Sequence, residues 1–140
     1  MKMEKIDRIL VAVKDLETSA EFFSNLLGLK FDKVWEEETQ QVKYARCSEG
    51  FELIQSTSPD GPVARFIEKR GEGLYAIIFK HHDMDAAIKE MEVKGVKMVS
   101  RPTTGRLQEA YFHPKDAHGV MIGLCEYEEK HGASVAEGES

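Results

Sequence analysis

Runs of apolar residues along the chain alternate between the spacing of strands and that of helices. Ile6–Val13 is a β-branched, aliphatic run that is short enough for a strand. Asp15 then precedes a segment in which apolar residues recur at helical spacing up to Gly28, which predicts a helix with an aspartate cap and a glycine end. The apolar positions of this helix are Leu16, Ala20, Phe23 and Leu27, widened by Phe22 and Leu26.

The same order of elements occurs a second time. Leu74–Lys80 is another run typical of a strand, and Asp83 begins a second helical pattern that ends at Gly95. Asp15 and Asp83 are 68 residues apart (83 − 15), and Gly28 and Gly95 are 67 apart (95 − 28). Further strands are predicted at Leu29–Trp35, Val42–Cys47 and Phe51–Gln55 in the first half and at Val96–Ser100, Gln108–Phe112 and Val120–Cys125 in the second. We therefore expect an α+β fold of two tandem βαβββ modules that form a curled mixed sheet around one cleft.

The expected organisation is a single domain over residues 1–128. The first module spans about 5–57, the second about 74–127, and residues 58–73 join them. Residues 129–140 lack periodicity and bulky apolar side chains, so we expect a flexible tail.

The joining segment carries a short helical pattern of its own. Asp60 is expected to cap this helix and Pro62 to lie in its first turn. The apolar residues that share one face are Val63, Phe66 and Ile67.

Charge and composition narrow the choice of partners. The 140 residues include 25 acidic and 19 basic side chains, a net charge of −6, which disfavours a nucleic-acid partner. No apolar run approaches the ~20 residues of a membrane span, so we expect no membrane partner. Two cysteines are too few for a disulfide scaffold, and the first residues lack the pattern of a signal peptide. We expect a cytoplasmic protein.

Three stretches resemble the vicinal oxygen chelate superfamily, the glyoxalase and bleomycin-resistance group, and within it the methylmalonyl-CoA epimerases. They are AVKDLETSAEFFSNLLGLKF (12–31), TSPDGPVARFIEKRGEGL (57–74) and FHPKDAHGV (112–120). The first is shared across the superfamily and implies the fold. The second and third are similar to loops that border the acyl-CoA site of the epimerase branch.

The resemblance implies one divalent metal ion between four strands, two from each module. Its ligands in the family are a His, a Gln or Glu, a second His and a Glu, and the corresponding positions here are Arg8, Glu52, Ala76 and Gly123. Arginine does not deprotonate, and neither a methyl group nor a hydrogen can bind a metal. We therefore expect no metal and no other cofactor.

Arg8 and Glu52 are expected to be in contact, because their counterparts in the family bind the same ion. One interpretation is that this ion pair only fills a lost metal site. The other is that Arg8 takes over the electrostatic task of the metal and binds a carboxylate or a developing enolate oxygen. Glu52 would then orient Arg8 or act as the base.

Further candidates lie in the second module and beside it. Glu109 is either an alternative base or only a solvated side chain on an edge strand. Alternation places it on one strand face with Tyr111 and His113. Lys115 forms a basic cluster with Arg65, Lys69 and Arg70 of the joining segment. The cluster is either ordinary solvated charge or a contact for the phosphates of a CoA-like group. Tyr75, Tyr111, His113 and Lys115 are thus the candidate substrate-binding residues.

The resemblance favours a metal-independent relative of methylmalonyl-CoA epimerase that binds a small acyl or carbonyl compound, such as an acyl-CoA. If it is an enzyme, the expected chemistry is that of an isomerase or a lyase acting by proton abstraction next to a carbonyl. The alternative is a non-catalytic protein that binds or sequesters a small molecule, as bleomycin-resistance members do. Family members commonly pair, so we expect a homodimer.

Overall fold

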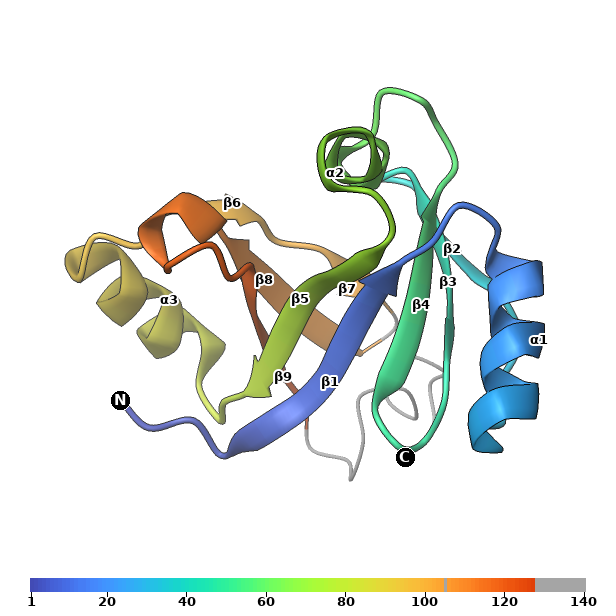
Figure 1. The fold of residues 1–140 in the computed structure, drawn as a ribbon. Coiled ribbons are helices and arrows are strands. Elements are labelled where there is room, and N and C mark those ends of the chain that lie inside the picture. The colour runs from blue at the N-terminus through green and yellow to red at the C-terminus, as the bar shows by residue number, and fades with distance from the viewer. Residues whose placement is uncertain (105, 128–140) are drawn as a thin grey trace. The chain divides into compact units, whose positions relative to one another are not determined.

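A computed structural model describes residues 1–104 and 106–127 (Figure 1). The chain divides into two compact units, Arg8–Tyr75 and a second unit made of Met1–Asp7 with the residues from Ala76 onward. The expected limits of the domain and of its modules stay predictions, and the expected tail at 129–140 lies outside the described residues.

The unit Arg8–Tyr75 is a four-stranded sheet with two helices. Its strands follow the order β2-β3-β4-β1, in which β1 and β4 are parallel and the other pairs are antiparallel. The elements are β1 (Lys5–Ala12), α1 (Leu16–Leu27), β2 (Trp35–Glu37), β3 (Val42–Arg46), β4 (Phe51–Ser56) and α2 (Pro62–Arg70). Both α1 and α2 pack against β4.

The other unit repeats this arrangement. Its strands follow the order β5-β9-β8-β6, with β5 and β9 parallel, and a two-residue strand, β7, is added beside β8. The elements are β5 (Gly73–Lys80), α3 (Met84–Val93), β6 (Met98–Ser100), β7 (Thr103–Thr104), β8 (Leu107–Phe112), the 3₁₀ turn η1 (Pro114–Asp116) and β9 (Ile122–Glu126).

The first helix of each module begins at an aspartate, as the sequence predicts. Asp15 Oδ1 accepts the Thr18 N–H at 2.9 Å, and Asp83 Oδ1 accepts the Ala86 N–H at 3.1 Å. A side chain of the last strand of each module completes the cap. Gln55 accepts the N–H of Leu16, and Glu126 accepts the N–H of Met84, both at 2.7 Å. The repeat therefore extends to the second side-chain hydrogen-bond acceptor at the start of each helix.

The two faces of β1 carry the side chains that alternation along the strand predicts. Arg8, Leu10 and Ala12 are buried on one face. On the other face, Val11 and Val13 belong to the apolar cluster that includes Leu16 of α1. Among the described residues, no helix has the length and apolar character that crossing a bilayer needs.

Three details of the sequence-based prediction are wrong. The strand expected at Leu29–Trp35 is only Trp35–Glu37, because the backbone N–H of Asp32 bonds instead to the carbonyl of Arg46 outside any ladder. The cap of α2 is Gly61 with no side-chain hydrogen bond, so Asp60 does not cap it. Three of the apolar positions expected on the buried face of α1 are exposed instead, with exposed fractions of 57% for Phe22, 63% for Leu26 and 56% for Leu27.

Candidate functional site

Two arginines share one carboxylate oxygen in the unit Arg8–Tyr75. Arg8 donates through Nη1 to Glu52 Oε1 at 2.9 Å, and Arg46 donates through Nε to the same oxygen, also at 2.9 Å. All three residues are buried, with exposed fractions of 2%, 1% and 3% for Arg8, Arg46 and Glu52. The expected contact between Arg8 and Glu52 is therefore present, and we call the three residues the Arg8–Glu52–Arg46 triad.

Strand pairing brings the triad together. Glu52 is paired with Leu10 across the parallel β1–β4 ladder, and Arg8 shares the strand face of Leu10. Arg46 lies directly opposite Glu52 in the antiparallel β3–β4 hairpin. The sequence reasoning missed Arg46 because no family ligand corresponds to it. The available signal was the short turn between β3 and β4, which places Arg46 across from Glu52.

The two guanidinium groups keep Glu52 ionised. Burial alone raises the pKa of the Glu52 carboxyl, but the charges of Arg46 and Arg8 and their hydrogen bonds outweigh burial, so the pKa lies below its ordinary value. A carboxylate held in this way is a weak base and a fixed acceptor.

The same register occurs in the second unit with different chemistry. Gly123 of β9 is paired with Ile78 of β5, and Tyr111 of β8 lies directly opposite Gly123. The pairs Leu10–Glu52 and Ile78–Gly123 are therefore equivalent. By this register, the counterparts of Arg8, Arg46 and Glu52 are Ala76, Tyr111 and Gly123.

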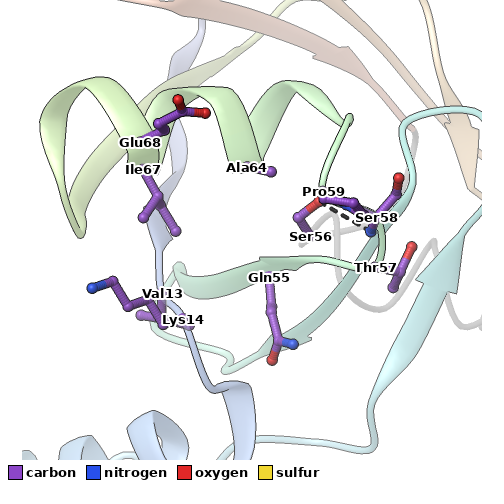
Figure 2. Close-up of a pocket in the computed structure, with 10 residues that line it drawn as sticks. All are labelled: Val13, Lys14, Gln55, Ser56, Thr57, Ser58, Pro59, Ala64, Ile67 and Glu68. Carbon is purple, nitrogen blue, oxygen red and sulfur yellow. Dashed lines mark hydrogen bonds between the residues drawn. The ribbon is translucent and has the colours of Figure 1, made fainter.

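A pocket of about 470 Å³ lies within the unit Arg8–Tyr75, between α2 and the ends of β1 and β4 (Figure 2). Its walls combine aliphatic side chains with hydroxyl groups and two charged side chains. The lining residues are Val13, Lys14, Gln55, Ser56, Thr57, Ser58, Pro59, Ala64, Ile67 and Glu68.

The pocket and the triad are connected by β4. Gln55 points away from the strand face of Glu52, whereas Ser56 shares that face by alternation. Ser56 is four residues beyond Glu52, about 13 Å along the strand at a rise of roughly 3.3 Å per residue. The pocket is thus a neighbour of the triad at the end of β4, and the triad does not line it.

Comparison with known proteins shows the family to which this chain belongs. Residues 5–124 match the model of the Glyoxalase/Bleomycin resistance protein/Dioxygenase superfamily. The chain belongs to this superfamily. An uncharacterized protein of Bacillus subtilis, YqjC, is 32% identical over 130 residues, which cover 89% of this chain and 93% of the relative.

Several of the similar proteins carry the name methylmalonyl-CoA epimerase. The mitochondrial methylmalonyl-CoA epimerase of Homo sapiens is 26% identical over 86% of this chain and 72% of its own length. A Streptomyces coelicolor methylmalonyl-CoA epimerase, solved in complex with 2-nitronate-propionyl-CoA, is 29% identical and superposes with a TM-score of 0.81 over 91% of this chain and 100% of its own. The expected fold class and the resemblance to the epimerases are confirmed.

The residues that the family resemblance assigns to metal-ligand positions do not fit a metal ion. Arg8 offers only N–H donors, Ala76 offers a methyl group, and Glu52 is already bound by two guanidinium groups. A side chain at position 123 would collide with its neighbours, since a Cβ there would lie 2.9 Å from Ile78 Cγ1 and 3.0 Å from Tyr111 Cε1. Among residues 1–104 and 106–127, no group of three or more His, Cys, Asp or Glu side chains is placed to hold a metal.

The remaining predicted residues differ in accessibility. Glu109 and Tyr111 are buried in β8. His113 and Lys115 are exposed, and His113 Nδ1 accepts the N–H of Lys115 at 3.0 Å at the start of η1. His113 therefore has a structural contact that the sequence did not predict. The proposed roles of all four stay predictions.

Tyr75 lies in the same unit as the triad and stacks edge-on against Phe66, with ring centroids 5.1 Å apart. Burial raises the pKa of the Tyr75 hydroxyl to about 12, and the charge of Arg65 opposes this shift. Tyr75 is therefore a neutral hydrogen-bonding group over the whole physiological range. Its role in substrate binding stays a prediction.

Proposed function

We propose that this protein binds an acyl-CoA thioester with a free carboxylate, of the methylmalonyl type, and moves the proton next to the thioester carbonyl without a metal ion. The observation that carries the proposal is the buried Arg8 guanidinium held by Glu52. The family resemblance assigns Arg8 to the position of the first metal ligand. The methylmalonyl-CoA epimerases among its relatives support the choice of ligand.

The proposed chemistry needs a fixed positive charge. Removal of the proton from the carbon next to the carbonyl sends an electron pair onto the carbonyl oxygen, which becomes an enolate oxygen. A guanidinium near this oxygen lowers the free energy of the enolate. The base releases the removed proton to water. A proton delivered from water to the opposite face of the carbon then returns the electron pair to a C–H bond and inverts the configuration.

The choice of base follows from the electrostatics of Glu52. The lowered pKa of its carboxyl makes Glu52 a better orienting group for Arg8 than a proton acceptor. Glu109, the other base that the sequence offers, is buried in β8, and its role stays a prediction.

The pocket beside α2 supports an elongated ligand. Its volume of about 470 Å³ falls in the range of small-molecule sites, roughly 300–1,000 Å³. Aliphatic walls with hydroxyl groups suit the amide-containing arm of CoA, and the ammonium group of Lys14 suits a phosphate. We propose that the arm of the thioester occupies this pocket.

The test is deuterium exchange into methylmalonyl-CoA in D₂O, with protein treated with a chelator, together with calorimetric binding. We expect exchange at the carbon next to the thioester, and its loss in Arg8→Met. Arg101→Met, which removes an exposed arginine paired with Asp85, is the matched control. Exchange that disappears with the chelator and returns with Co²⁺ would contradict metal independence. Absence of both exchange and binding would overturn the proposal.

A second candidate function is binding without catalysis. The weak basicity of Glu52 and the lack of a side chain at Gly123 favour it. Micromolar binding of an acyl-CoA without any deuterium exchange would select this function.

We further propose a homodimer in the cytoplasm, and isomerase rather than lyase chemistry. The isomerase assignment follows the names of the relatives. Light scattering after gel filtration tests the homodimer, and a monomer at micromolar concentration would exclude it.

A further inference from the structure

Arg46 is fixed from several directions at once. Its backbone carbonyl accepts the N–H of Asp32 at 2.9 Å, and its own N–H donates to Asp32 Oδ1 at 3.1 Å. Its guanidinium lies over the ring of Tyr44, 4.3 Å from the centroid, and reaches Glu52 across the hairpin. These contacts leave little freedom to the Arg46 side chain.

Glu52 connects Arg46 to Arg8. Both guanidinium groups donate to the same oxygen, Oε1, so the position of this oxygen determines where the Nη1 atom of Arg8 lies. Arg46 comes from β3, directly opposite Glu52, whereas Arg8 comes from β1. Pairing in the β3–β4 hairpin therefore fixes the position of the Glu52 carboxylate, and this carboxylate in turn fixes the position of the Arg8 guanidinium.

We propose that Arg46 is a positioning residue of the candidate site: it holds the Glu52 carboxylate in place, and through Glu52 it fixes the Arg8 guanidinium without itself contacting the ligand. This inference rests on the proposed function for its ligand-binding part. It assigns a role to a residue for which the superfamily ligand pattern has no counterpart.

The electrostatics agree with this geometry. Against burial, the charge of Arg46 is the largest influence that lowers the pKa of the Glu52 carboxyl, and the charge of Arg8 comes next. Without Arg46, less would oppose the effect of burial on this pKa, and Glu52 would bind a proton at a higher pH. The groups placed against Glu52 are Arg8 from β1 and Arg46 from β3, with Tyr44 and Asp32 in contact with Arg46.

The experiment compares wild type with Arg46→Met, Arg46→Lys and the exposed-arginine control Arg101→Met. The first readout is the ¹³C carboxyl resonance of Glu52 as a function of pH, assigned by its absence from Glu52→Gln. The second is the affinity for methylmalonyl-CoA, measured by calorimetry from pH 5 to pH 8. If Arg46→Met does not fold, Arg46→Gln removes the charge and keeps a hydrogen-bond donor.

We expect Arg46→Met to titrate Glu52 at a higher pH than wild type does. Its affinity should then fall about tenfold for each pH unit below the new pKa, because protonated Glu52 no longer forms an ion pair with Arg8. Wild type and Arg101→Met should show no such fall in affinity. Arg46→Lys, which keeps a positive charge at this position, should show only a small part of the fall. A purely structural role for Arg46 would change the affinity equally at every pH.

Two results would each contradict a different part of the inference, and the experiment distinguishes them. An unchanged Glu52 titration in Arg46→Met, or an affinity profile that matches wild type, overturns the positioning role. Absence of methylmalonyl-CoA binding to wild type, with a shifted Glu52 titration in Arg46→Met, overturns the ligand-binding part together with the proposed function, and leaves the link between Arg46 and Glu52 intact.

Discussion

Tyr111 lies directly opposite Gly123, and its ring fills the space that a side chain at position 123 would need. In the other module, the equivalent pair is Arg46 and Glu52, whose side chains form an ion pair at 2.9 Å. One strand register therefore carries an ionic pair in one module and a packed ring over a glycine in the other. The charged chemistry of the two equivalent sets lies entirely in the first module.

Substitution of Gly123 by Ala should destabilise the protein. The added Cβ would lie 2.9 Å from Ile78 Cγ1, and overpacking of a buried site costs about 1–3 kcal/mol. Urea unfolding measures this cost. The double variant Gly123→Ala/Tyr111→Ala should be more stable than the sum of the two single effects predicts, because removal of the ring relieves the collision. Strictly additive effects would contradict the close packing of Tyr111 on Gly123.

Loss of the Glu52 charge should reduce stability. Glu52→Gln leaves two buried guanidinium groups without their carboxylate, and removal of one partner of a buried ion pair costs about 3–5 kcal/mol. Denaturant unfolding at neutral pH measures the difference from wild type. A loss below about 0.5 kcal/mol, the size of a surface effect, would contradict the triad.

The same variant has a pH signature. Because the pKa of Glu52 is lower in the folded state than its ordinary value of 4.5, its contribution to stability is complete above that value. The contribution is lost as pH falls through the folded-state pKa. The gap in unfolding free energy between wild type and Glu52→Gln should therefore close below pH 4.5, and a gap that widens there would refute the lowered pKa.

The Tyr75 hydroxyl should lose its proton at a higher pH than the hydroxyl of an ordinary tyrosine. Its pKa of about 12 lies above its ordinary value of 10, so the folded protein retains the phenolic proton while the unfolded chain loses it between these values. The contribution of Tyr75 to stability is then complete below pH 10 and lost as pH rises toward 12. Absorbance at the tyrosinate band should show a late transition that Tyr75→Phe removes. A transition near the ordinary value would contradict the burial of the hydroxyl.

A single substitution should show how much the Asp83 cap of α3 contributes to the free energy of unfolding. Asp83→Ala removes the acceptor of the Ala86 N–H, which costs about 0.5–2 kcal/mol. Asp83→Asn retains an acceptor oxygen and should remain close to wild type. Equal losses in the two variants would indicate that the charge, rather than the hydrogen bond, stabilises the start of α3.

The sequence determined the repeat and the two capped helices, because helical periodicity and cap residues are local properties. The expectation that Arg8 contacts Glu52 came from the family resemblance, in which the counterparts of both residues bind the same ion. Only the tertiary structure decided that Arg46 joins them, that Tyr111 covers Gly123, and that residues 29–34 form no strand. Those outcomes depend on which strands pair and in what register, and such long-range contacts leave no periodic signal in the chain.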